Sequence, residues 1–317
     1  MSDAPIIFEY EHGIFSVDTQ YQRTGLAASH LIVEDGHVGI VDTGANSAVP
    51  LLLAALDRQG LDPASVDYLF LTHVHLDHAG GAGLLMRSLP RAVALLHPRG
   101  APHMIDPARL IAGSRAVYGP ERYDALYGEI VPIPASRVRE VADGEQIELG
   151  GRTLRCMHTE GHARHHYCID DSQASAVFTG DSFGVSYREL DTAAGPFVMP
   201  TTTPVQFDPV AAHEAVDRIV GTGAESAFLT HYSRVRDLPS LAGQLHRDLD
   251  FYVSTAEGLG EGEQREDRLV GVLGDYYRDR LSRHGPDDIE TALGLLEMDI
   301  RLNAQGLLVW LQRRGAY

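Results

Sequence analysis

The most restrictive feature of this chain is an apolar segment, residues 67–71, that runs directly into the sequence Thr-His-Val-His-Leu-Asp-His-Ala-Gly-Gly. The apolar run is typical of a buried strand. His73 and His75 lie two residues apart at its exit, so extended backbone points both rings to one side. The glycines allow a sharp turn that lets Asp77 and His78 face the same point. Imidazole and carboxylate groups bind zinc, iron or manganese, and we therefore predict a metal site at this strand end.

Three further segments end a predicted strand with a metal-ligating side chain. One holds four histidines in nine residues. There His162 follows a glycine in the turn and is the expected ligand, whereas His158 and His166 are expected to support or pack against the site. Asp181 ends the next strand pattern with a carboxylate that can bridge two cations, and His231 ends another. A single strand-end acid or histidine is commonly a capping residue, but four such ends in one chain indicate a shared metal centre.

The predicted elements divide the chain into two strand-rich halves, an insertion between them and a helical tail. Residues 100–130 show helical patterns around 105–118 and 122–130, split by Gly119-Pro120, and we interpret them as an inserted helical pair. Helices are also predicted over 49–61 and 209–220, and a long irregular segment over 182–209. The predicted domains are 1–236 and a helical C-terminal extension, 237–317. The predicted strands are 6–10, 14–17, 29–34, 37–42, 67–71, 92–96, 137–141, 153–157, 167–169, 176–178 and 227–229.

Charge and composition narrow the function classes. The chain has 26 basic and 44 acidic residues, a net charge of −18, which disfavours binding to nucleic acid or to anionic membranes. Every basic residue is arginine, which excludes Schiff-base, general-base and Walker-type lysine chemistry. Two cysteines are too few for a disulfide framework, and no secretory or membrane-spanning pattern is visible. We therefore predict a cytoplasmic protein that acts on a small molecule.

Taken in order, these segments resemble the metal-binding motifs of the metallo-β-lactamase fold superfamily. The matching strings are H-x-H-x-D-H at 73–78, T-E-G-H at 159–162, T-G-D at 179–181 and T-H at 230–231, preceded by the D-[ST]-G signature at 42–44. The resemblance covers roughly residues 25–235. It implies an α/β fold, the αββα sandwich, as the catalytic domain, to which the inserted helical pair and the C-terminal helices are additions.

The resemblance also implies seven ligands around two divalent metal ions, with zinc favoured over iron or manganese. The ligands of the first ion would be His73, His75 and His162, those of the second Asp77, His78 and His231, and Asp181 would bridge the two ions. Asp42 would support the loop geometry without binding metal.

The ligand set distinguishes among branches of the superfamily. True β-lactamases of the commonest zinc type place a cysteine where this chain has Asp181, and oxygen-reducing di-iron flavoproteins usually place a glutamate where it has His75. Nuclease branches generally add an RNA-binding exosite, against which the charge argues. The remaining group resembles glyoxalase II, acyl-homoserine-lactone lactonases and the thioesterase of alkylquinolone signalling. The chain departs from glyoxalase II in lacking lysine, and from the lactonases in having Gly184 where they commonly have tyrosine.

The predicted reaction is hydrolysis of a thioester, lactone or ester. Two metal ions about 3.5–4 Å apart can share a water and lower its pKa, so that the resulting bridging hydroxide attacks an acyl carbonyl. Asp77 is the predicted catalytic residue, as proton acceptor and carrier.

Substrate contacts and lids are predicted from their positions near these motifs. The insertion, the irregular segment and the C-terminal helices are the expected lids. The apolar periodicity of those helices fits equally well a pocket wall, a cover for the sandwich or the surface of a homodimer. The expected substrate contacts are Tyr187, Arg188, Tyr232 and Arg164, with Asn303, Gln305 and Trp310 as further residues that could line a pocket.

Three other interpretations remain. Residues 180–184 match the G-x-S-x-G nucleophile elbow of serine hydrolases, with Ser182 as nucleophile and His231 as base, although an elbow requires a helix immediately after the serine. The chain could also be a metal-bound ligand-binding or signalling module without catalysis, since metal sites are structural in many proteins. The third is an iron-dependent redox enzyme of the same fold.

Overall fold

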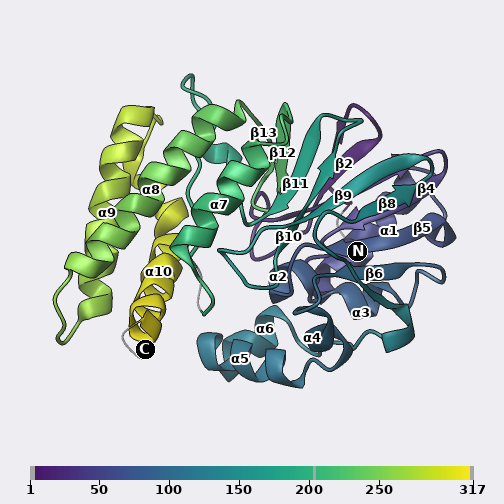
Figure 1. Ribbon diagram of the computed structural model, residues 1–317, viewed down its shortest axis with the longest axis horizontal. Coiled ribbons are helices and arrows are strands. Elements are labelled where there is room, and N and C mark those ends of the chain that lie inside the picture. The colour runs from purple at the N-terminus through teal and green to yellow at the C-terminus, as the bar shows by residue number, and fades with distance from the viewer. Residues whose placement is uncertain (1–3, 203–204, 315–317) are drawn as a thin grey trace.

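Two β-sheets packed face to face, with helices on both outer sides, form the main body of the molecule (Figure 1). The computed structural model describes residues 4–202 and 205–314. This arrangement confirms the predicted αββα sandwich. In the described part of the chain, no helix is long and apolar enough to cross a lipid bilayer.

The first sheet has seven strands in sequential order. Strands β1 to β4 pair antiparallel, and β4 to β7 pair parallel, so that β4, β5 and β6 all end at one edge. The strands are β1 (Ile7–Tyr10), β2 (Ile14–Asp18), β3 (Ala28–Glu34), β4 (His37–Val41), β5 (Val66–Leu71), β6 (Val93–Leu96) and β7 (Val138–Glu140).

The second sheet has six strands in the order β13-β12-β11-β10-β9-β8. Only β11 and β12 pair parallel, and these two strands carry the predicted acid and histidine at their ends. The strands are β8 (Gln146–Leu149), β9 (Arg152–His158), β10 (Tyr167–Asp171), β11 (Ala176–Gly180), β12 (Ser226–Leu229) and β13 (Ser233–Arg236).

Three apolar layers stabilise the sandwich. The middle layer lies between the sheets, where Phe70 from the first and Phe178 from the second are fully buried. An outer layer joins the first sheet to α1, and another joins the second sheet to α7 and to the start of α8. The helices of the sandwich are α1 (Val49–Arg58), α2 (Leu76–Ala79), α3 (Ala82–Leu85) and α7 (Pro209–Val220).

The insertion differs from the predicted helical pair by one additional helix. It consists of α4 (Ala101–Ile105), α5 (Ala108–Tyr118) and α6 (Pro120–Leu126). The first break lies at Asp106, whose backbone is extended because it precedes Pro107. The second lies at Gly119, as predicted, with a φ of +78°. The pair of the prediction corresponds to α5 and α6.

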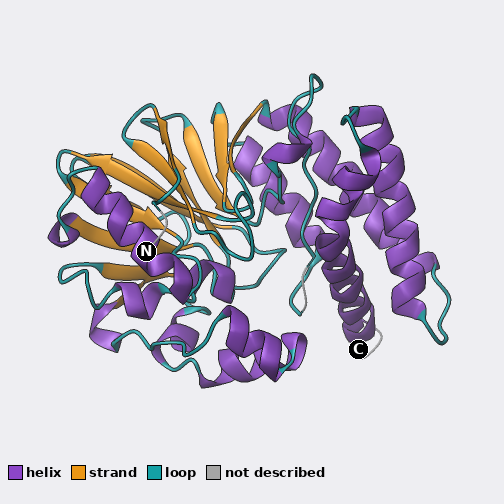
Figure 2. Ribbon diagram, turned by 180° about the vertical axis from the view of Figure 1, so that it is seen from behind, coloured by secondary structure: helices purple, strands orange, loops and turns teal. Residues whose placement is uncertain are grey.

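The tail forms three long helices beside the sandwich, α8 (Leu238–Gly258), α9 (Arg265–His284) and α10 (Ile289–Arg314) (Figure 2). Strands β8 and β13 were not predicted, because they are short and because half of the residues of β8 and three of the four residues of β13 are polar. The apolar faces of the three helices pack against one another and against the irregular segment that follows β11.

Candidate metal centre

Four chain segments bring metal-ligating side chains to one edge of the sandwich. His73 and His75 follow β5, His162 lies between β9 and β10, Asp181 follows β11 and His231 follows β12. The short helix α2 turns Asp77 and His78 toward the same point. The structure thus brings together all seven residues that were predicted as ligands, in two groups.

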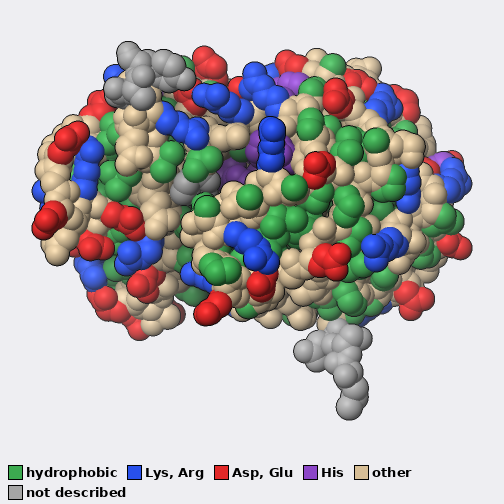
Figure 3. All heavy atoms as spheres, turned by 90° about the horizontal axis from the view of Figure 1, so that it is seen from below, with side chains coloured by type: hydrophobic (Ala, Val, Ile, Leu, Met, Phe, Trp, Pro, Cys, Tyr) green, Lys and Arg blue, Asp and Glu red, His purple; other side chains and the backbone are tan. Residues whose placement is uncertain are grey.

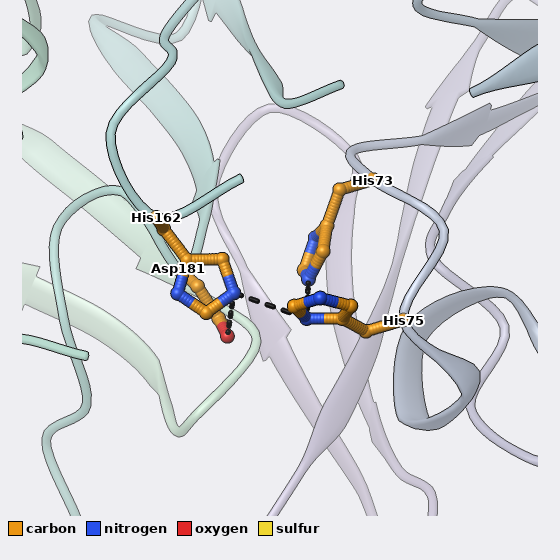
Figure 4. Close-up of side chains that lie close together, drawn as sticks. All are labelled: His73, His75, His162 and Asp181. Carbon is orange, nitrogen blue, oxygen red and sulfur yellow. Dashed lines mark hydrogen bonds and ion pairs between the residues drawn. The ribbon is translucent and has the colours of Figure 1, made fainter. Parts of the chain in front are cut away.

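The first group consists of three imidazoles and one carboxylate whose polar atoms face one another (Figure 4). His73 Nε2 lies 2.9 Å from His75 Nδ1, and His162 Nε2 lies 3.1 Å from the same atom. His162 Nε2 is also 3.4 Å from Asp181 Oδ2. Spacings of this size between donor atoms are those of ligands that share one ion.

The second group is built from Asp77, His78 and His231. Asp77 Oδ2 lies 3.4 Å from His231 Nε2 and 3.9 Å from His78 Nε2. The other oxygen of Asp181, Oδ1, lies 3.3 Å from His78 Nε2 and 3.8 Å from His231 Nε2. Asp181 therefore directs one oxygen to each group.

Asp42 lies behind the second group, where it contacts the nitrogen of His78 that points away from the other ligands. Its backbone has a φ of +55°, and its carboxylate is completely buried. It accepts hydrogen bonds from the Thr72 amide at 2.9 Å, from the Thr230 hydroxyl at 2.9 Å and from His78 Nδ1 at 2.7 Å. A buried carboxylate with this many donors fixes the loops that carry His73, His78 and His231.

Hydrogen bonds on the outer nitrogen orient the other histidines as well. His231 Nδ1 donates to the carbonyl of Leu26 at 2.7 Å, so that Nε2 is the nitrogen that faces Asp77 and Asp181. His162 Nδ1 lies 2.7 Å from the hydroxyl of Thr201 and 3.4 Å from its carbonyl. Such partners determine which nitrogen of a histidine is free to bind metal.

Gly180 allows Asp181 to turn into the site. Its φ is +49°, and a Cβ there would lie 2.6 Å from His166 Nε2 and 2.7 Å from the Thr72 hydroxyl. The amide of Asp181 donates to His166 Nε2 at 3.2 Å, and the other nitrogen of His166 contacts Thr159 and Ser182. His166 therefore contacts the backbone that carries the Asp181 carboxylate.

The electrostatics divide these groups. The carboxylates around His78 and His231 outweigh burial and raise the pKa of both, so these two imidazoles must lose a proton to bind metal. The other groups are held in their metal-binding forms. Burial, reinforced by neighbouring histidines, lowers the pKa of His73 well below its usual value and that of His75 to about 3. Burial would raise the pKa of Asp77 and of Asp181, but nearby His78 and His231 outweigh it and lower both. Neutral imidazoles and ionised carboxylates are the forms that bind metal.

Two buried atoms show that the residues fit a divalent cation. His78 Nε2 and Asp181 Oδ1 are both buried and face each other, and neither has a hydrogen-bond partner among residues 4–202 and 205–314. Buried polar atoms without partners are rare, because each costs about 1–3 kcal/mol. Imidazole nitrogen and carboxylate oxygen are a donor set suited to zinc, iron or manganese.

A cavity of about 460 Å³ opens directly onto the two groups, between α5 and α10. His75, Asp77, Asp181 and His231 lie at its base. In the space-filling view, histidine side chains are visible in a hollow flanked by arginines (Figure 3). The two groups of candidate ligands are therefore accessible to a small molecule.

Of the four predicted substrate contacts, only Tyr187 lines this cavity. Arg188 instead donates to the carbonyls of Ser186 and Arg234. The Tyr232 hydroxyl donates to Asp18 at 3.0 Å, on the other side of the strand end. Arg164 is exposed. These three residues are not among those that line the cavity, because nearness in sequence to a ligand does not determine where a side chain lies.

The structure also places two further histidines of the segment 158–166, His158 and His165. His158 donates to the carbonyl of Val141 at 3.0 Å and packs against His97, so its contacts lie away from the seven residues. Of the two roles expected for it, supporting a ligand or packing, these contacts correspond to packing. His165, to which no role was assigned, lines the cavity and lies beside His73 and His75. The density of histidines in this segment was the only signal for it.

The C-terminal residues that could line a pocket do not line it. Asn303 is buried and accepts from the Thr202 amide at 2.7 Å, Gln305 donates to Glu266, and Trp310 packs against Phe207. The residues of α10 that do line the cavity are Met298, Asp299 and Leu302. They precede Asn303 by five, four and one residues. Periodicity alone did not identify them as the residues of α10 that face the cavity.

The nucleophile-elbow interpretation lacks its structural context. Turns, and no helix, follow Ser182, and the Ser182 hydroxyl donates to the carbonyl of Thr159 at 3.1 Å. His231, the suggested base, faces Asp77.

Comparison with known proteins agrees with this architecture. The model of the metallo-beta-lactamase superfamily matches residues 23–231. A metallo-beta-lactamase fold-containing protein of Sulfurisphaera tokodaii is 30% identical over 172 residues, which are 52% of this chain and 58% of that protein. An acyl-coenzyme A thioesterase of Bos taurus is 29% identical over 179 residues, 53% of this chain and 63% of that protein. In both cases the chain spans less than two thirds of its relative.

Solved structures show the same fold over a larger share of the chain. An archaeal metallo-beta-lactamase superfamily protein from Sulfolobus tokodaii superposes with a TM-score of 0.64 at 22% identity, covering 93% of this chain and 98% of that one. A metallo-beta-lactamase family protein from Thermus thermophilus superposes with a TM-score of 0.62 at 21% identity, covering 99% and 93%.

Proposed function

The chain belongs to the metallo-beta-lactamase superfamily, and we propose that it is a hydrolase of small acyl compounds (thioesters, lactones or esters) that binds two divalent metal ions. The observation that carries this proposal is the position of Asp181, whose two oxygens face two separate groups of ligands at 3.4 and 3.3 Å. The similarity to an acyl-coenzyme A thioesterase supports the acyl class. Zinc is the favoured metal, with iron and manganese as alternatives for the same donors.

The chain would supply the geometry and the proton transfer for this reaction. Two divalent ions, when bound, lower the pKa of a water and polarise a substrate carbonyl. Asp77 lies at the base of the cavity with its side chain 21% exposed, and it is the ligand carboxylate better placed to exchange a proton with a substrate. Asp42 and Thr201 hold His78 and His162 in place while this happens.

The test is an activity panel on protein of measured metal content. We expect at least one thioester, lactone or ester to be hydrolysed, the activity to disappear after chelation, and zinc, iron or manganese to restore it. A serine-reactive phosphonate should have no effect. Phosphodiesters serve as the control class.

Three results would contradict the proposal. Metal-loaded protein that hydrolyses nothing in the panel would be a binding module, and inactivation by the phosphonate would indicate Ser182. Activity that needs iron and consumes oxygen would indicate the redox alternative.

A further inference from the structure

The cavity above the metal centre is mainly apolar, with one carboxylate that belongs to neither ligand group. Its walls come from α5, α10 and the segment around Tyr21. Leucine, valine, methionine and tyrosine side chains form the apolar part of these walls. A space of about 460 Å³ holds an acyl chain or an aromatic ring of moderate size. Among the residues of α10 that line the cavity, Asp299 is the polar one, beside Met298 and Leu302.

Within the described ranges, Asp299 accepts side-chain hydrogen bonds from one residue, Tyr187. The hydroxyl of Tyr187 donates to its two carboxylate oxygens, at 3.0 and 3.2 Å. Within the described ranges Asp299 forms no ion pair, although the chain has 26 arginines. An ionised carboxylate can accept about four hydrogen bonds, so Asp299 has acceptor capacity left on the side that faces the cavity.

The surroundings of Asp299 and Tyr187 favour an ionised carboxylate and a protonated hydroxyl. Burial raises the pKa of Asp299 to about 6, so the carboxylate is ionised in mildly alkaline buffer. Burial and the nearby Asp299 raise the pKa of Tyr187 well above its usual value, so its hydroxyl stays a donor. Arg23 covers the Tyr187 ring at 4.9 Å from the centroid and ties to Glu189, which fixes the ring in place. A partly desolvated carboxylate in a cleft favours a function over a structural role.

Besides Asp299 and the histidines, three charged residues line the cavity. Asp77 and Asp181 are in the ligand groups, and Arg109 is exposed on α5 at the outer part of the cavity. The inner wall thus presents an acceptor that forms no ion pair within the described ranges. Its positive neighbours are Arg23, which is paired with Glu189, and His231, which faces the ligand groups. The carboxylate therefore repels an anionic group and attracts a donor.

We propose that Asp299 selects substrates whose apolar acyl part carries a hydrogen-bond donor, such as a hydroxyl or an amide N–H. This proposal rests on the proposed function. The donor would bind the free acceptor side of the Asp299 carboxylate while the acyl carbonyl lies at the metal centre. Tyr187 acts as a positioning residue that holds the carboxylate toward the cavity. A carboxylate or phosphate at the same place on the substrate is disfavoured.

The test compares matched thioesters of octanoic acid at pH 8 with zinc-loaded protein. One thioester is unsubstituted, and one ends in a carboxylate. The other three each carry one hydroxyl, placed close to the thioester, in the middle of the acyl chain or at its far end. We expect at least one hydroxylated thioester to exceed the unsubstituted one in kcat/KM by about ten- to hundredfold, the range for a hydrogen bond to a charged group. Asp299→Ala should abolish this preference and improve the anionic thioester, and Asp299→Asn should retain part of the preference.

Glu297→Ala is the control, because Glu297 is an exposed acid on the same helix. It should leave all five rates unchanged, and melting temperatures show whether each variant is folded. Tyr187→Phe should raise KM for the preferred thioester more than it changes kcat. Equal rates for all five thioesters in the wild-type protein, or a preference that survives Asp299→Ala, would overturn the proposal.

Binding of the corresponding amides, measured by calorimetry, separates this proposal from the hydrolase proposal. If no thioester is hydrolysed but a hydroxylated amide binds more tightly in a way that depends on Asp299, the recognition stands and hydrolysis is refuted. If thioesters are hydrolysed without any preference, the hydrolase stands and the recognition is refuted.

Discussion

Replacing Asp77 by asparagine should lower kcat by about 10²–10⁴-fold, the usual contribution of a positioned proton acceptor. The substitution keeps the size of the side chain and an oxygen near His231, from which Asp77 Oδ2 is 3.4 Å away. It removes the charge that accepts the proton. The measurement is turnover of the best substrate from the activity panel, with metal content determined on the same samples.

Two comparisons make this result specific. Asp279→Asn removes an exposed carboxylate on α9 that pairs with Arg283, and it should leave kcat unchanged. Asp77→Glu restores a carboxylate and should recover part of the rate. Turnover by Asp77→Asn at the wild-type level, with both metal ions present, would eliminate Asp77 as proton carrier.

Gly306→Ala should weaken the metal centre from a distance. Gly306 lies on α10 against the loop that carries Thr201, and a Cβ there would lie 1.4 Å from the carbonyl oxygen of Thr202. The loop must move, and with it the Thr201 hydroxyl that lies 2.7 Å from His162 Nδ1. We expect a loss of about 1–3 kcal/mol in stability from overpacking. Metal affinity should fall by about 10–100-fold, as when a partner of a metal ligand is lost.

Gly294→Ala is the matched control on the same helix. A Cβ at Gly294 meets nothing within 4 Å, so the substitution should stabilise α10 by about 0.5–1 kcal/mol and leave metal binding unchanged. Thr201→Val removes the hydroxyl contact alone and should reproduce the loss of affinity without the loss of stability. If Gly306→Ala binds metal as tightly as the wild type, α10 does not position His162.

The sandwich was predicted from the resemblance of the ordered motifs to the superfamily, whereas local patterns were sufficient to predict that the seven ligands converge. Each ligand follows a short buried strand, and strands that pair in one sheet bring their ends together. The orientation of His73 and His75 needed only the two-residue alternation of an extended chain, whereas the role of Asp42 was implied by the resemblance.

The cavity could not be predicted in the same way because it depends on contacts between distant segments. Asn303 contacts Thr202 across 101 residues, and Asp299 contacts Tyr187 across 112. Helical periodicity identifies the apolar face of α10 but not the segment that it covers. Arg188 and Tyr232 were misplaced for the same reason, since their partners are Arg234 and Asp18, on segments far away in the sequence.

The most direct test of the metal centre is anomalous diffraction from crystals grown with zinc, combined with metal analysis of the protein in solution. The account predicts two ions per chain, one among His73, His75 and His162 and one among Asp77, His78 and His231, with an Asp181 oxygen on each. A single ion, or ions bound away from these seven side chains in metal-saturated crystals, would contradict it.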